Sequence, residues 1–231
     1  MKQPSPIVFD KERAASYDKQ TDLWASGREA MFTFMRLILA DLPPDAHILC
    51  VGVGTGTELI ALAQAFPNWR FTAVDPAPAM LDVCRQKIEE SGLSARCTFH
   101  EGYLDSLPPG ESFDAATCLL VSHFFNQSQE RSDFFGQIAA RLKPSAFLIS
   151  SDLVLGQSPP VYESLFEVWT RMLRGSGWSE ENIENIRTAY GRDVAKLTAP
   201  QVESIIEAGG FETPVLFFQT LFIHAWYSKR V

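Results

Sequence analysis

The sequence has few residues of the types that hold metal ions, with four cysteines and four histidines among 231 residues. No two cysteines form a CxxC pair, and no histidines show the HExxH spacing that places two imidazoles on one face of a helix. Cys50 and Cys118 lie inside apolar runs, as expected of buried, reduced thiols in a cytoplasmic protein. These absences predict that the protein has no metal site.

Long apolar runs and an excess of positive charge are missing as well. The longest apolar stretch, residues 30–42, is interrupted by Arg36 and Asp41, so no membrane span is expected. The first residues, MKQPSP, lack the apolar core of a signal peptide, and a cytoplasmic location is expected. Lys and Arg number 20 against 28 Asp and Glu, a formal net charge of -8. Such an acidic surface repels phosphate backbones, which makes a nucleic acid an unfavourable partner.

The sequence does contain a regular alternation of strand-like and helix-like segments. Two helical segments come first, at residues 10–19 and 28–40. Short apolar runs typical of buried parallel strands follow, alternating with segments of helical periodicity. The strands are expected at 47–51, 70–74, 95–99, 113–121 and 146–153, the helices at 57–66, 77–91, 130–142 and 200–208, and a terminal hairpin at 213–218 and 222–227. This order predicts an α/β fold with a parallel sheet between helices.

One further segment, residues 158–196, is mostly helical in pattern and follows the fifth predicted strand. The length of the chain suits a single domain, residues 1–231, that carries this segment as an insertion. The insertion is expected to be a cap that holds a substrate or an element that makes a homodimer. Four of its side chains either line an apolar pocket or pack its helices together: Trp169, Met172, Trp178 and Tyr190.

A glycine-rich loop, residues 51–58 (VGVGTGTE), joins the first strand to the next helix. Its glycines allow a tight turn and a close approach of a ligand, and the helix start offers free N–H groups. Asp75 ends the following strand, where a carboxylate can accept hydrogen bonds from both ribose hydroxyls of a nucleoside. The dinucleotide pattern GxGxxG is not met, because Thr57 or Leu59 stands at the third glycine. A nucleoside is therefore favoured over a nicotinamide dinucleotide.

This pattern resembles motif I and its partner acid in the class I S-adenosylmethionine-dependent methyltransferases. Residues 75–81 (DPAPAML) resemble the ribose and adenine segment of that superfamily, and residues 99–108 the loop along the adenine edge. Residues 113–125 resemble its fourth strand, and residues 142–144 (LKP) the turn before the fifth. The resemblance implies a Rossmann-like, doubly wound sheet of seven strands in the order 3-2-1-4-5-7-6, one of them antiparallel. It also implies S-adenosyl-L-methionine as the cofactor and in-line transfer of its methyl group to a small-molecule acceptor.

The resemblance assigns cofactor contacts to residues at the carboxyl ends of the strands and on the N-terminal helices. These are Gly52, Val53, Gly54, Gly56, Asp75, Pro76, Met80, Tyr103, Leu104, Leu119, Tyr17 and Arg28. Tyr17 either covers the cofactor or packs its helix on the sheet, and Arg28 either reaches the methionine carboxylate or is solvated. His123, after the fourth strand, is the candidate catalytic residue, as an acid/base or by orienting the acceptor; the alternative is a pocket-wall histidine.

Two positions depart from the superfamily pattern. Cys50 stands where an acid usually anchors the methionine part, and we expect Glu58 to be an exposed helix residue that substitutes for it only if it turns inward. Tyr103 replaces an Asp that accepts from the adenine amino group, and its ring is expected to stack on or cover the base. These replacements leave open a protein that binds S-adenosylmethionine without catalysis.

Within the superfamily the layout is similar to that of the carboxy-S-adenosylmethionine synthases of tRNA wobble modification. The shared features are a start such as Phe9-Asp10, a helical insertion after the fifth strand, and a terminal Gly-Phe followed by Phe-Gln. In that family an Arg of the insertion binds the extra carboxylate across a dimer interface, and Arg187 falls near the matching place. The family's Asn at the end of the fourth strand is replaced by Leu119. A synthase of this kind is the alternative function.

Overall fold

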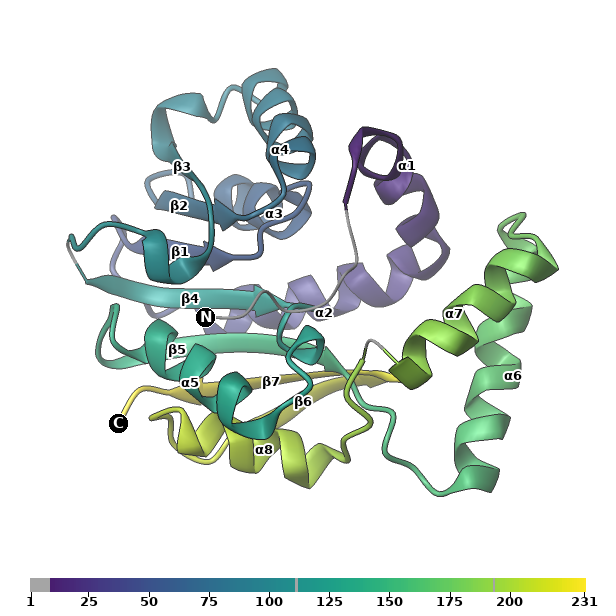
Figure 1. Cartoon of the computed structure of the whole chain (residues 1–231). Helices are drawn as coiled ribbons and strands as arrows, with labels where there is room; N and C mark the ends of the chain where they lie inside the picture. Colours follow the sequence, from purple (N-terminus) through teal and green to yellow (C-terminus); the bar gives the residue numbers. More distant parts are fainter. Residues whose placement is uncertain (1–8, 111, 193) are drawn as a thin grey trace.

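A single seven-stranded sheet forms the centre of the protein, seen in a computed structural model that describes residues 9–231 except 111 and 193 (Figure 1). The strands are β1 (His47–Val51), β2 (Arg70–Asp75), β3 (Cys97–Glu101), β4 (Phe113–Leu119), β5 (Leu142–Leu153), β6 (Val215–Thr220) and β7 (Ile223–Lys229). Their order is β3-β2-β1-β4-β5-β7-β6. Strands β1 to β5 are parallel, whereas β7 pairs antiparallel with both β5 and β6. The predicted order and the single antiparallel strand are confirmed.

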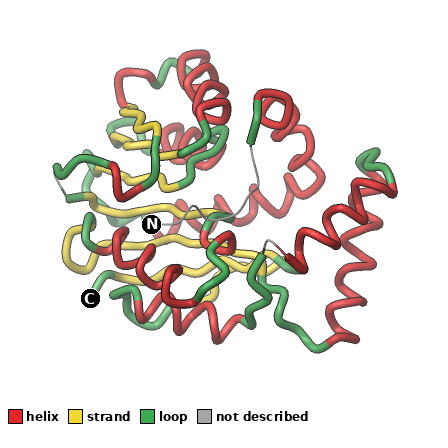
Figure 2. The backbone as a smooth tube through the Cα atoms, viewed as in Figure 1, coloured by secondary structure: helices red, strands yellow, loops and turns green. Residues whose placement is uncertain are grey.

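Helices cover both faces of this sheet (Figures 1 and 2). On one face α2 (Ala25–Ile38), α3 (Thr57–Ala65) and α4 (Pro78–Glu90) bury apolar side chains against β1 and β2. On the other face α5 (Ser128–Ala139) and α8 (Ala199–Ala208) pack on β4, β5 and β7. The strands β1, β2 and β4 are buried along almost their whole length, as expected for a parallel sheet covered on two sides. The helix α1 (Lys11–Thr21) precedes α2.

The start of β5 differs from the prediction. The preceding helix was expected to run to residue 142, but α5 ends at Ala139, and Leu142 already pairs with Phe113 on β4. The segment 142–144, expected to be a turn, therefore lies within β5. Pro144 has no N–H to donate to the ladder, and Ser145 has a φ of 58°, so the register to β4 shifts here. Similarly, β3 begins at Cys97 instead of residue 95, because Ser94–Arg96 form a 3-10 turn.

The insertion after β5 forms two helices, α6 (Pro159–Gly175) and α7 (Glu180–Arg192), which stand beyond the ends of the strands at the right of Figure 1. They pack on the ends of β5 and β7 through a separate apolar cluster. Phe222 is its centre, with its ring 5.4–6.5 Å from the rings of Tyr162, Phe166, Trp169 and Tyr190. Across the described part of the chain, no helix is both long and apolar enough to cross a membrane.

Candidate functional site

The glycine loop between β1 and α3 has the backbone that only glycine adopts easily. Gly52, Gly54 and Gly56 have φ of 65°, 55° and 80°. A Cβ built on Gly52 lies 2.4 Å from a methyl of Val121, and one on Gly56 lies 2.5 Å from the sulfur of Cys84. The loop is thus both left-handed and tightly packed, which places its N–H groups at the carboxyl end of the sheet.

Asp75, the last residue of β2, holds this loop in place. One carboxylate oxygen accepts from the N–H of Gly54 at 2.8 Å, and the other accepts from the N–H of Ala77 at 2.9 Å. The side chain is only 7% exposed, and burial raises the pKa of Asp75 while the two N–H bonds oppose that rise. Each oxygen keeps a free lone pair, so the carboxylate can also accept from two ribose hydroxyls.

A cavity of about 430 Å³ lies over Asp75 and the loop. Nine of the twelve predicted cofactor residues line it: Tyr17, Gly52, Gly54, Asp75, Pro76, Met80, Tyr103, Leu104 and Leu119. Val53 and Arg28 line a smaller neighbouring cavity. Gly56 lines neither; it precedes α3 with a left-handed backbone and faces Cys84. The predicted residues that line a cavity therefore lie together near β1 and β4. The strand order of the sheet reverses between these two strands, and open α/β sheets bind ligands at such a point.

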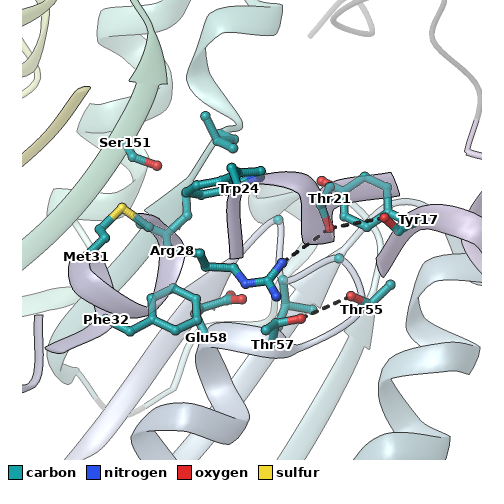
Figure 3. Close-up of a pocket in the computed structure, with 15 residues that line it drawn as sticks. Tyr17, Thr21, Trp24, Arg28, Met31, Phe32, Thr55, Thr57, Glu58 and Ser151 are labelled. Carbon is teal, nitrogen blue, oxygen red and sulfur yellow. Dashed lines mark hydrogen bonds between the residues drawn. The ribbon is translucent and has the colours of Figure 1, made fainter. Parts of the chain in front are cut away.

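The smaller cavity, of about 80 Å³, is also lined by the glycine loop (Figure 3). Arg28 from α2 and Glu58 from α3 both point into it. The Arg28 guanidinium donates to Thr21 at 3.4 Å and to Asp22 at 3.0 Å, while its buried Nε has no partner in the described residues. Tyr17 and Leu119 line both cavities, so the two form neighbouring compartments of one site.

Glu58 is where the prediction was wrong. It was expected on the exposed side of its helix, but it is 8% exposed, because the first turn of α3 starts directly at the loop and faces α2. Among the residues that the structure describes, no cation lies within ion-pair distance of it. Burial raises the pKa of Glu58 to about 7, a rise that its own backbone N–H and Lys87 only partly offset. Cys50, buried on β1, has a thiol whose pKa is raised well above its ordinary value by burial.

His123 lies in a 3-10 turn, Ser122–Phe124, that follows β4. It is 3% exposed, its Nδ1 is 3.3 Å from a carboxylate oxygen of Asp152, and it lines neither cavity. Asp152 is also bound by Ser122 at 2.7 Å and by Arg131 at 2.8 Å. The structure therefore places His123 in a buried polar cluster behind the site, and its neighbour Phe124 in the cavity wall. A catalytic role for His123 stays a prediction.

The chain turns sharply where β4 ends. β4 was expected to continue to residue 121, but it stops at Leu119, and Leu120 has a φ of 57°. A left-handed leucine is strained, and its N–H is held by the carbonyl of Ser151 at 2.8 Å. Leu120 lines both cavities and also packs on the apolar cluster of α6 and α7. It is thus the link between the site and the insertion.

The residues predicted in the insertion lie outside both cavities. Trp169, Met172, Trp178 and Tyr190 belong to the cluster around Phe222. Arg187 pairs with Glu163 at 3.0 Å and lies 4.1 Å over the ring of Phe166. Within this chain, then, no described residue of 158–196 lines the two compartments.

Comparison with known proteins adds to this geometry. Residues 48–145 match a family described as a methyltransferase domain. Over 179 residues the chain is 25% identical to the carboxy-S-adenosyl-L-methionine synthase of Campylobacter lari, a match that covers 77% of the chain and 74% of that relative. It is 29% identical over 180 residues to the biotin biosynthesis bifunctional protein BioHC of Teredinibacter turnerae, covering 75% of the chain but only 29% of that longer protein. Magnesium protoporphyrin IX methyltransferase from Synechocystis, solved with bound SAH, has a similar fold, with a TM-score of 0.63, 16% identity and 94% of both chains covered.

The doubly wound sheet, the glycine loop and the acid after β2 define a nucleoside-binding α/β protein. More particularly, residues 48–145 match a methyltransferase domain, and the similar proteins support the class I S-adenosylmethionine-dependent superfamily, with S-adenosyl-L-methionine as the co-substrate. The superfamily, the cofactor and the class of enzyme predicted from the sequence are confirmed.

Proposed function

We propose that this protein transfers the methyl group of S-adenosylmethionine to a small-molecule acceptor. The observation that carries the proposal is the arrangement of charge in the site. Asp75 marks the larger compartment, which we assign to the ribose and adenine, between the loop, Met80 and Tyr103. Arg28 and Glu58 mark the smaller one. One molecule that carries a nucleoside and a zwitterionic amino acid satisfies both compartments.

The zwitterion argument rests on Arg28 and Glu58 facing one small cavity without forming an ion pair with each other. Glu58 has no ion-pair partner among the described residues, and a buried charge without a partner is costly, so it favours a ligand of opposite charge. Arg28 already pairs with Asp22, but its buried Nε has no partner in the described residues and can still donate to an anion. The carboxylate of the methionine part suits Arg28, and its ammonium suits Glu58. Glu58 thus takes over on α3 the part that an acid at position 50 plays on β1 in the superfamily pattern.

The chemistry asks little of the protein beyond alignment. The methyl carbon of a sulfonium is already a strong electrophile, so the acceptor needs only to approach in line with the breaking bond in a site without water. Tyr17, Leu119 and Leu120 line both compartments, and the methyl group is expected between them. The direct test is calorimetric titration with S-adenosylmethionine and with its demethylated product. Absence of binding at millimolar ligand would refute the proposal.

Glu58→Gln is expected to weaken S-adenosylmethionine binding by roughly 10- to 100-fold at pH 8, because a hydrogen bond between charged groups is lost. In the wild type, binding should weaken as the pH falls through about 7, where the buried carboxylate becomes protonated. The glutamine variant should lose this pH dependence. Calorimetry between pH 6 and pH 8.5, roughly one pH unit or more to either side, measures both effects. Equal affinity of both proteins at pH 8 would remove Glu58 from the site.

Glu58→Gln should weaken ligand binding but raise the stability of the ligand-free protein. Because burial raises the pKa of Glu58 from an ordinary 4.5 to about 7, ionising it costs stability, and that cost grows from pH 4.5 and is complete above pH 7. Glu58→Gln should therefore stabilise the ligand-free protein by up to about 3 kcal/mol above pH 7. Thermal unfolding without ligand measures this gain, which separates a lost contact from a misfolded variant.

A protein that binds the cofactor without catalysis predicts a different result at position 50. If the site has decayed, Cys50→Asp should restore much affinity. If Glu58 has replaced the missing acid, a second buried carboxylate nearby should bring no gain, because like charges raise each other's pKa. Cys50→Asp combined with Glu58→Gln then moves the acid back to β1 and should bind better than Glu58→Gln alone. Calorimetry on the three variants distinguishes the two cases.

The similarity to carboxy-S-adenosyl-L-methionine synthases supports a second candidate, a synthase of that kind. Arg187, the residue suggested for the extra carboxylate, is engaged by Glu163 on the arm of α6 and α7. It can serve that role only for the site of a second copy. Titration with S-adenosylmethionine and with its carboxylated derivative compares the two candidate functions. Arg187→Ala should weaken binding of the carboxylated derivative only.

We further propose that residues 158–196 act on the acceptor side of the site or form a dimer contact. The support is the apolar cluster of Trp169, Met172 and Tyr190, which reaches Leu120 in the wall of both cavities. Changing all three to Ala should impair acceptor turnover more than S-adenosylmethionine affinity. Turnover that survives while the protein becomes monomeric would make the insertion an interface instead.

A cytoplasmic location stays a prediction.

A further inference from the structure

The larger cavity is lined almost entirely by side chains that cannot take up a proton. Its described lining contains three ionisable groups, and two of them, Tyr17 and Tyr103, are phenols, which act as proton donors. The third, Asp75, accepts N–H bonds on both oxygens and is assigned to the ribose. In the smaller compartment Glu58 and Arg28 are assigned to the amino-acid end.

The imidazole of His123 does not belong to the lining of either cavity. The Nδ1 of His123 lies 3.3 Å from Asp152, and its ring packs 4.3 Å from the ring of Phe124. Phe124, not His123, contributes to the cavity wall. A general base has to come within hydrogen-bond reach of the proton that it removes, and His123 lies outside the described lining that an acceptor would touch.

The wall near Phe124 is aromatic and comes from two parts of the chain, the N-terminal segment and the turn after β4. The ring of Phe9 lies edge-on to Tyr17 of α1 at 6.1 Å and to Phe124 at 6.4 Å. All three residues line the larger cavity. Aromatic side chains arranged in this way offer faces and edges to a flat, apolar molecule.

From these observations, and resting on the proposed function, we propose that the acceptor is a flat apolar molecule whose nucleophilic atom is already an anion at neutral pH. A thiolate or a carboxylate on an aromatic ring has this chemistry. Its lone pair forms the bond to the methyl carbon, the bond from that carbon to sulfur breaks, and the electron pair goes to the sulfur. The products are a neutral methyl thioether or ester and the demethylated cofactor, and no proton is transferred.

Charge favours the same acceptor. The sulfonium of the donor is positive, and an anion beside it in an apolar, water-poor cavity is attracted more strongly than in water. An alcohol or a phenol has to lose a proton during the reaction. The carboxylates of the described linings, Asp75 and Glu58, are both assigned to the donor, which leaves no base for that proton. General base catalysis contributes about 10²–10⁴-fold, so its absence separates the two kinds of acceptor clearly.

The test uses four acceptors that share one ring: thiophenol, benzoate, phenol and benzyl alcohol. With saturating S-adenosylmethionine, formation of the demethylated cofactor is measured for each. Thiophenol or benzoate should react at least about 100-fold faster in kcat/KM than phenol or benzyl alcohol at pH 7. With thiophenol, the pH profile should follow the ionisation of the acceptor and should shift when a nitro group makes the thiol more acidic.

A preference for phenol or benzyl alcohol would overturn the inference while confirming methyl transfer. The inference would also be overturned if the pH profile contained an ionisation that stays at the same pH when the acceptor is changed and that is lost in His123→Asn. No transfer to any of the four also overturns it, and donor titration then still decides the proposed function. Phe124→Ala should raise the KM for the reactive acceptor roughly tenfold with donor affinity unchanged, whereas the control Phe34→Ala, on an exposed position of α2, should change neither.

Discussion

Asp75→Ala should weaken binding of S-adenosylmethionine by roughly 100-fold or more, because two charge-assisted hydrogen bonds to the ribose are lost, each worth about 1.5–3 kcal/mol. The effect should be larger than that of any other single change among the lining residues, because this one carboxylate holds the loop and, in the proposed function, also binds the ribose. It accepts from Gly54 in the loop and from Ala77 before α4. Isothermal titration calorimetry measures the loss.

The variant also leaves the N–H groups of Gly54 and Ala77 without an acceptor, so its thermal stability should fall modestly. Asp82→Ala is a matched control, because Asp82 is an exposed Asp of α4 that pairs with Arg85 at 3.0 Å, away from the cavity lining. It should leave both affinity and stability nearly unchanged, as surface ion pairs contribute little. If Asp75→Ala folds and keeps full affinity, the ribose is bound elsewhere.

Local sequence patterns predicted most of the fold and most of the residues that line the larger cavity. The buried strands, the glycine loop and the acid at the end of β2 are each recognised from residues that are neighbours in the sequence. Residue type and spacing are therefore enough to predict where they lie. The start of β5 was misplaced because Pro144 suggests a turn, whereas the strand continues past it with a shifted register. Such irregularities depend on pairing with a distant strand, which no local pattern reports.

The lining of the smaller cavity was harder to predict, because its charged groups come from separate helices. Glu58 looks like an exposed residue of α3 until α2 is laid across that helix's first turn. One signal for it was present, since an acid in the first turn directly after a glycine loop lies beside any ligand of that loop. The burial of His123 against Asp152 has no local signal, because Asp152 is 29 residues further along the chain, on β5. Only the packed fold shows that this histidine lies outside the lining of both cavities.

That buried cluster leads to the largest expected effect on stability. Asp152 and Arg131 are both fully buried and lie 2.8 Å apart, and Arg131 also donates to Ser122 at 2.8 Å. Asp152→Ala leaves the guanidinium buried without its countercharge, which should cost about 3–5 kcal/mol of unfolding free energy. Denaturant unfolding measures the loss. Glu167→Ala is the matched control, because its pair with Arg171 is exposed and its loss should cost less than about 1 kcal/mol.

The double variant Asp152→Leu with Arg131→Met tests whether the cost comes from the unpaired charge. It should be more stable than Asp152→Ala, because no buried charge is left alone. An equally unstable double variant would instead assign the loss to packing. The pH dependence of stability gives a second test of the role of the ion pair. Burial alone would raise the pKa of Asp152, but Arg131, His123 and Ser122 outweigh it, so the pKa lies below its ordinary value.

A lowered pKa in the folded state means that Asp152 stabilises the protein above the pKa of an unfolded carboxyl and that this contribution is lost as the pH falls through the folded pKa. Acid unfolding of the wild type should therefore include a component that is absent in the double variant. Because Ser122 and His123 belong to the same turn as Phe124, the cluster also sets the cavity wall. The folded double variant should thus bind S-adenosylmethionine nearly normally but have a raised KM for the acceptor. Unchanged acceptor kinetics would show that this turn keeps its place without the ion pair.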